Sequence, residues 1–146
     1  MKTLNKCLAL IGAPILLATA AGCSRKAEKA NLGSSELAEK TSPQLIDVTE
    51  AKRLIAARQV AIFDVRTPNE FRTGHLAGAT NLDFHDADFE TKLQQSDKSQ
   101  PYLVHCAVGG RNARASATMK RLGFKSVYDL AGGINAWEKT KQEVVK

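Results

Sequence analysis

The residues best suited to chemistry lie in one short segment around Cys106. An apolar run beginning at Leu103 ends at Cys106, and a loop with two glycines then leads to an arginine. Backbone N–H groups in such a loop, and the N-terminus of a helix after it, provide partial positive charge. These surroundings favour a thiolate over a thiol and also suit a bound oxyanion. Cys106 is therefore the candidate nucleophile, and the candidate anion-binding residues are Ala107, Val108, Gly109, Gly110 and Arg111.

Two other interpretations concern this segment. A free cysteine is often a buried core residue, but Cys106 precedes a glycine loop, and we expect it to be poorly placed to fill a core. His105 comes directly before Cys106. Because successive residues of a strand face opposite sides of a sheet, we expect His105 to be structural and not the general base for Cys106.

Alternating strands and helices are expected to position this segment. Apolar runs predict strands at 44–48, 60–65, 79–82, 101–106 and 126–130, and helical patterns lie at 49–58, 67–72, 89–95, 111–122 and 134–139. Thr49 is the expected N-cap of the first helix, Thr67 and Glu70 have the spacing of a capping box, and 89–95 resembles a polar surface helix. This order predicts a three-layer α/β fold, with a central, mostly parallel sheet flanked by helices. Ligands of such sheets bind outside the carboxyl ends of the strands, where Cys106 must lie.

The N-terminal residues have the features of an export signal. Lys2 and Lys6 precede a short apolar run that ends at Ala20-Ala-Gly-Cys23, so residues 1–22 are expected to be a signal peptide. The ending resembles the lipobox of bacterial lipoproteins, with Ala20 where Leu is usual, and this implies lipidation of Cys23. An ordinary signal peptide, or an uncleaved anchor, is the alternative. Residues 23–43 are polar and are expected to form a flexible linker, so the chain is expected in the periplasm or cell envelope, attached to a membrane by lipid.

Composition excludes several classes of function. The chain has 146 residues and a formal charge of +6, but residues 44–146 hold 15 basic and 12 acidic side chains with the signs interspersed. A nucleic-acid-binding domain would concentrate its positive charge, so no nucleic-acid partner is expected. Three scattered cysteines are too few for a disulfide framework or a zinc cluster, and no metal site is expected.

Several separated motifs in residues 44–140 resemble the rhodanese family of single-domain sulfurtransferases. The resemblance is carried by Asp64-Val-Arg66 with Glu70-Phe71, by Gly74-His75-Leu-Ala-Gly-Ala-Thr-Asn81, by the Cys106–Arg111 loop, and by Leu130-Ala-Gly-Gly-Ile-Asn-Ala-Trp137. Asn112 stands where the family has Ser. Residues 44–140 are accordingly expected to form a rhodanese-like domain, followed by a C-terminal tail at 141–146.

The resemblance implies a sulfurtransferase with no metal or organic cofactor. It implies that Cys106 accepts a sulfane sulfur as a persulfide, and that the loop amides and Arg111 hold the oxyanion of the donor. The expected small-molecule partners are a thiosulfate-like sulfur donor and a thiol or cyanide acceptor. A second family motif, expected at the other end of the domain core, is interpreted mainly as a structural polar network; its members are Asp64, Arg66, Glu70 and His75.

Two other functions remain open from the sequence. A phosphatase or arsenate reductase also uses a cysteine and an arginine in an anion-binding loop, typically with five residues between them. Here four residues separate Cys106 from Arg111, and the tighter loop favours a smaller electrophile. A non-catalytic binding module of the same family is the second alternative, which the retention of Cys106 in a complete loop disfavours.

Overall fold

The computed structural model of the chain describes residues 43–146. The expected signal peptide at 1–22, the lipidation site Cys23 and the linker up to residue 42 lie outside the described residues. Within 43–146, no helix is long and apolar enough to cross a membrane.

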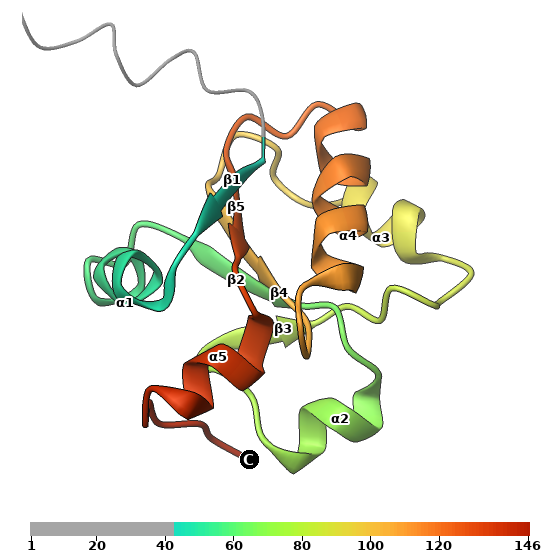
Figure 1. The fold of residues 1–146 in the computed structure, drawn as a ribbon. Helices are drawn as coiled ribbons and strands as arrows, with labels where there is room; N and C mark the ends of the chain where they lie inside the picture. Colours follow the sequence, from blue (N-terminus) through green and yellow to red (C-terminus); the bar gives the residue numbers. More distant parts are fainter. Residues whose placement is uncertain (1–42) are drawn as a thin grey trace, which may run out of the picture. The chain divides into compact units, whose positions relative to one another are not determined.

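The described part of the chain folds as an alternating α/β domain around one sheet (Figure 1). The sheet has five strands in the order β1-β5-β4-β2-β3, and its neighbouring strands pair in parallel. This confirms the predicted three-layer α/β class. In chain order the elements are β1 (Gln44–Ile46), α1 (Val48–Ala56), β2 (Ala61–Asp64), α2 (Pro68–Thr73), β3 (Ala79–Asn81), α3 (Phe89–Gln94), β4 (Tyr102–His105), α4 (Gly110–Arg121), β5 (Val127–Leu130) and α5 (Gly133–Lys139).

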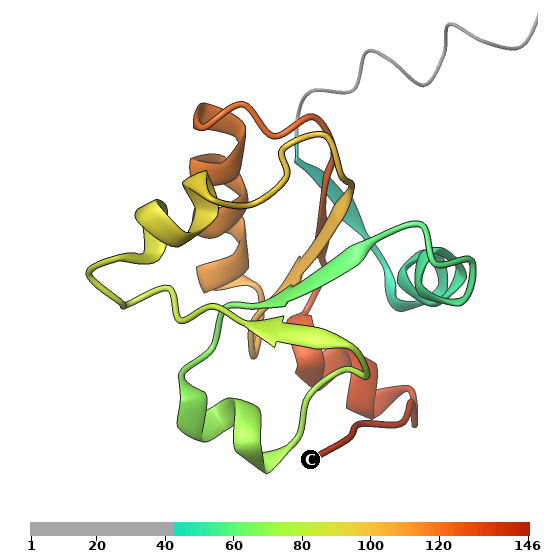
Figure 2. The same ribbon diagram turned by 180° about the vertical axis from the view of Figure 1, so that it is seen from behind.

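Helices cover both faces of the sheet, and each face has its own apolar core. α3 and α4 pack on one face through side chains such as Leu93 and Met119. α1 and α5 pack on the other face through side chains such as Ala51 and Trp137. Figures 1 and 2 show these two layers from opposite sides, with α2 beyond the end of the sheet. The central strand β4 is buried along its whole length, as expected of a strand covered on both faces.

The first helix begins earlier than its sequence pattern predicts. Asp47, and not Thr49, is the N-cap of α1: its carboxylate accepts a hydrogen bond from the N–H of Glu50 at 2.9 Å, and its backbone is extended. An aspartate caps a helix well because its side-chain oxygen satisfies one of the unpaired N–H groups of the first turn. The strand expected at 44–48 therefore ends at Ile46. The predicted capping box of α2 is confirmed, with Thr67 and Glu70 bonded reciprocally.

The helix at 89–94 is not the purely polar surface helix expected from its sequence. Phe89 and Leu93 are buried, and they join the core between the sheet and α4. The two residues are four positions apart and so lie on one side of the helix. A two-residue apolar side on a six-residue helix is too short to stand out against the polar residues between.

The residues after α5 pair with the domain. The N–H of His75 donates to the carbonyl oxygen of Val145, and the reverse bond is also present, both at 2.9 Å. The indole Nε1 of Trp137 donates to the carbonyl oxygen of Glu143 at 2.9 Å. The segment expected as a tail at 141–146 thus passes along α5 and reaches the turn after α2.

Candidate active site

Cys106 follows β4 directly, at the carboxyl edge in the middle of the sheet. β4 lies between β5 and β2, so the loop 106–109 emerges between neighbouring strand ends on both sides. Gly109 has a φ of +115°, a conformation that favours glycine, and it turns the chain into α4. Val108 is 67% exposed at this turn, while Gly110 is the first residue of α4.

The start of α5 forms hydrogen bonds with the backbone of this loop. The N–H of Ile134 donates to the carbonyl oxygen of Cys106 at 2.8 Å, and the N–H of Asn135 donates to that of Ala107 at 3.1 Å. Gly133 makes this approach possible: a Cβ there would lie 2.7 Å from the carbonyl oxygen of Ala107. Its φ of +58° also favours glycine. The glycine pair after β5 therefore serves the conformation of the Cys106 loop.

The thiol of Cys106 is completely buried. The expectation that Cys106 would be poorly placed to fill a core is wrong, because its side chain lies on the same face as that of Val104 and belongs to the core under α4. Its Sγ accepts a hydrogen bond from the N–H of Gly109 at 3.2 Å and donates one to Oδ1 of Asn112 at 2.9 Å. The sulfur thus lies between the loop and the first turn of α4.

Arg111 points from the start of α4 to Glu70 of α2. Its two terminal nitrogens donate to the two carboxylate oxygens of Glu70, each at 2.7 Å. The guanidinium lowers the pKa of Glu70 to about 2 against the opposing effect of burial. Hydrogen bonding to Glu70, with a smaller contribution from Cys106, raises the pKa of Arg111. The expected anion-binding arginine is therefore beside the sulfur, but it is paired with a carboxylate of its own chain.

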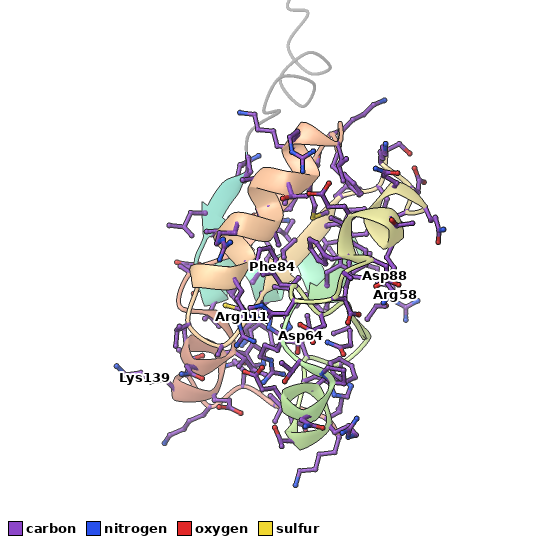
Figure 3. All side chains as sticks on the ribbon, turned by 90° about the vertical axis from the view of Figure 1, so that its right-hand side faces the viewer. Arg58, Asp64, Phe84, Asp88, Arg111 and Lys139 are labelled. Carbon is purple, nitrogen blue, oxygen red and sulfur yellow. The ribbon has the colours of Figure 1, made fainter. Side chains whose placement is uncertain are left out.

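The second motif was expected at the other end of the core as one polar network. It lies instead at the same end as Cys106, and its members belong to separate contacts. Asp64 and Arg66 form a buried pair at 2.6 Å, and Arg66 also donates to the carbonyl oxygen of Gly74 at 2.7 Å. Glu70 belongs to the Cys106 site through Arg111, and Figure 3 shows Arg111 and Asp64 both between the lower end of α4 and α2. His75 stacks on the ring of Phe71 at 3.7 Å between centroids. The motif lies at the active-site edge because β2 and β4 are adjacent and parallel.

His105 lies away from the thiol. Its Nε2 is 3.7 Å from Oδ2 of Asp64, and both side chains are fully buried. Burial lowers the pKa of His105, and the nearby Asp64 carboxylate opposes this effect. The ring therefore belongs to the Asp64–Arg66 cluster, as expected of a structural residue, and it makes no contact suited to deprotonating Cys106.

Sequence reasoning missed a polar contact between α4 and β5. Asn112 is fully buried and donates from Nδ2 to the carboxylate of Asp129 and, at 3.1 Å, to the carbonyl oxygen of Leu130. Burial raises the pKa of Asp129 to about 6, against the lowering effect of its bond to Asn112. The sequence offered two signals of this contact. Asn112 stands where the family has Ser, and Asp129 interrupts an apolar strand. Among residues 43–146, no group of three or more His, Cys, Asp or Glu side chains could hold a metal ion.

Known proteins share this domain over most of its length. The rhodanese-like domain family matches residues 36–140. The thiosulfate sulfurtransferase GlpE of Pseudomonas entomophila is 36% identical over 87 residues, which cover 59% of this chain and 77% of that protein. Thiosulfate sulfurtransferase 16, chloroplastic, of Arabidopsis thaliana is 34% identical over 111 residues, which cover 69% and 92%.

Solved structures agree with this relationship. A crystal structure of a rhodanese-related protein from Thermoplasma volcanium is similar with a TM-score of 0.63 and 27% identity, covering 70% of this chain and 97% of that one. A protein from Staphylococcus saprophyticus is similar with a TM-score of 0.61 and 28% identity, covering 70% and 99%. The family match includes the whole Cys106 loop and every strand of the sheet. The chain belongs to the rhodanese-like domain family.

Proposed function

We propose that the chain is a thiosulfate sulfurtransferase in which Cys106 carries the transferred sulfur as a persulfide. The observation that carries this proposal is the environment of the Cys106 sulfur. Cys106 follows the central strand, and its Sγ accepts a hydrogen bond from the N–H of Gly109 at 3.2 Å, beside the Arg111 guanidinium. A backbone donor and a fixed positive charge both stabilise a thiolate. Family membership and the two similar thiosulfate sulfurtransferases support the same activity.

The proposed reaction proceeds in two displacement steps. The Cys106 thiolate attacks the outer sulfur of thiosulfate, the sulfur–sulfur bond breaks, and sulfite leaves with the bonding electron pair. A thiolate or cyanide then attacks the outer sulfur of the persulfide, and the Cys106 thiolate leaves. This is covalent catalysis by an activated nucleophile. Neither step needs an external oxidant or reductant.

Arg111 and the loop are proposed to bind the anionic end of the donor. A guanidinium has five N–H groups, and the bidentate pair with Glu70 engages one N–H of each terminal nitrogen. The remaining N–H groups are available to an oxyanion beside the sulfur. Groups that are already in place when negative charge develops on departing sulfite lower the barrier. Because Cys106 is fully buried, a donor can reach Sγ only when neighbouring residues move.

Burial of the thiol also favours a second candidate function, a non-catalytic binding module. A cysteine without exposed surface behaves as a small apolar core residue, and the loop with its exposed Val108 would then serve as a contact surface. The loop disfavours a phosphatase, since four residues separate Cys106 from Arg111 where phosphatases typically have five.

One set of assays on the full chain separates these functions. We expect thiocyanate to form from thiosulfate and cyanide, and we expect no hydrolysis of an aryl phosphate ester. Cys106→Ser should remain folded by circular dichroism and form thiocyanate only at the background rate, because a hydroxyl is a weak nucleophile and cannot store sulfane sulfur. Thiocyanate formation by the Ser variant would contradict the assigned nucleophile. Absence of both activities in the wild type would favour the binding module.

We further propose that the domain is exported and attached to a membrane through a lipid on Cys23. The support is the basic and apolar N-terminus and its Ala-Ala-Gly-Cys ending. The polar residues 23–43 would then separate the enzyme from the membrane surface.

A further inference from the structure

Asn112 connects the Cys106 sulfur to a buried carboxylate on the neighbouring strand. Its Oδ1 lies 2.9 Å from Sγ, and its Nδ2 donates to both Asp129 and the carbonyl oxygen of Leu130. Asn112 has no exposed surface, and Asp129 is 5% exposed. The amide of Asn112 therefore makes its hydrogen bonds inside the domain, to the sulfur on one side and to β5 on the other.

The partners on β5 determine which end of the amide faces the sulfur. The carbonyl of Leu130 can only accept a hydrogen bond, and an ionised Asp129 can only accept one. Both must face the NH₂ group of Asn112, so the amide oxygen is turned towards Sγ. An amide oxygen is itself only an acceptor, and its bond to Cys106 therefore requires the protonated thiol.

We infer that Asn112 and Asp129 are positioning residues. They hold Cys106 as a thiol in the resting protein, until the thiolate is needed as the nucleophile. The inference rests on the proposed function, in which the thiolate of Cys106 is the nucleophile. A hydrogen bond to the neutral form of a group disfavours its charged form. Loss of the proton to water replaces the S–H bond with a repulsion between the thiolate and Oδ1. Asp129 acts on the sulfur through Asn112, by holding the amide in this orientation.

The groups nearest the sulfur on its own face act in the opposite direction. The N–H of Gly109 donates to Sγ, and the Arg111 guanidinium, paired with Glu70 of α2, faces it from the start of α4. Both favour the thiolate. Asp129, the acidic residue of β5, lies on this face behind Asn112. The ionisation of Cys106 is thus a balance, in which Asn112 opposes Gly109 and Arg111.

Other charged groups near the thiol lie on the far face of the sheet or further along α4. Asp64, Arg66 and His105, from β2, β4 and the residues beyond them, form their own buried cluster. Arg114 lies with its guanidinium 4.9 Å from the ring centroid of Phe84. Their geometry gives them no bond to Asn112 or Sγ. Substitution of Asn112 therefore tests the inference without disturbing these groups.

The test measures thiol ionisation directly in the full chain. The rate of alkylation of Cys106 by iodoacetamide is followed across pH by mass spectrometry of the peptide that contains it, so Cys7 and Cys23 do not interfere. In the wild type, the Asn112 atom that faces the sulfur is Oδ1, which can only accept a hydrogen bond. Asn112→Ser replaces the amide with a hydroxyl, which can donate a hydrogen bond to a thiolate. We expect the pH midpoint of alkylation to fall below that of the wild type. If this variant does not fold, Asn112→Thr provides the same hydroxyl.

Asp129→Asn should lower the midpoint in the wild-type background but not in the Asn112→Ser background, since residues that act as a unit are not additive. Ser116→Ala, which removes a different buried polar group from α4, should leave the midpoint unchanged. An unchanged or raised midpoint in Asn112→Ser would overturn the inference. An equal effect of Asp129→Asn in both backgrounds would overturn the role of Asp129. Alkylation needs no sulfur donor, so a failure of sulfur transfer alone would count against the proposed function and not against this inference.

Discussion

Arg111 is placed between the carboxylate of Glu70 and the sulfur of Cys106. Arg111→Ala should raise the KM for thiosulfate about tenfold, because one charge-assisted hydrogen bond contributes roughly 1.5–3 kcal/mol and this site is partly open to solvent. Arg111→Lys should restore binding only in part, since an ammonium lacks the planar fork. Steady-state kinetics across thiosulfate concentrations provide the measurement.

A matched control for this prediction lies on the same helix. Arg121 also pairs with a glutamate of another helix, Glu90 of α3, at 2.5 Å, but it is at the far end of α4. Arg121→Ala should leave the KM for thiosulfate unchanged. An equal effect of the two substitutions would mean that Arg111 serves the helix and not the donor.

The ion pair between α2 and α4 makes stability depend on pH at the scale of elements. Glu70 has a pKa of about 2 in the folded chain, below the ordinary value of 4.5, mainly through its bonds to Arg111. A lowered folded pKa contributes stability that is complete above the unfolded value and is lost as pH falls towards the folded one. Stability from this pair should therefore disappear between about pH 4.5 and pH 2.

Urea unfolding of Glu70→Gln tests this dependence. Between about pH 7 and about pH 3, the variant should lose less unfolding free energy than the wild type. Asp129 contributes in the opposite sense, because its pKa is raised to about 6, but this contribution is common to both proteins and cancels. Glu138→Gln removes the same charge from an exposed position of α5 and controls for net charge. Parallel pH curves for wild type and Glu70→Gln would contradict the assignment.

Because the start of α5 packs on the Cys106 loop, the stability of the domain should depend on the residue at position 133. Gly133→Ala should destabilise the domain by about 2–5 kcal/mol, because a left-handed residue would gain a Cβ that collides with the backbone of Cys106 and Ala107. Gly123→Ala is the matched control: its φ is +89°, but its Cβ would meet nothing within 4 Å. It should cost only about 1–2 kcal/mol of backbone strain. Similar melting temperatures for the two variants would contradict the close packing of α5 on the loop.

Local sequence signals were sufficient for most of the strands and helices and for the position of Cys106 at the end of β4. Apolar runs located β2, β4 and β5, and the glycines after Cys106 located the loop. The pairings across the site were not predictable in this way. Arg111 and Glu70 are 41 residues apart in the chain and Asn112 and Asp129 are 17 apart. Such pairs depend on which strands are neighbours, and no local periodicity carries that information.

In the whole molecule, the proposed membrane attachment and the proposed catalysis belong to different parts of the chain. A truncated chain beginning at Thr41 should be soluble and as active as the full chain, because every residue assigned to catalysis lies beyond it. Wild-type protein should incorporate labelled fatty acid and sediment with membranes, whereas Cys23→Ala should not incorporate it. Several acyl chains anchor firmly because each buried methylene contributes about 0.8 kcal/mol. Lack of labelling in the wild type would contradict the lipid anchor, and a folded but inactive truncation would contradict the domain boundary.

If Cys106 carries the transferred sulfur, incubation with thiosulfate must change the intact mass of the chain. The wild type should gain the mass of one sulfur atom, the gain should map to the peptide containing Cys106, and cyanide should remove it. Cys106→Ser should gain nothing under the same conditions. A wild-type mass that stays unchanged while thiocyanate still forms, or a sulfur found on Cys7 or Cys23, would contradict the account.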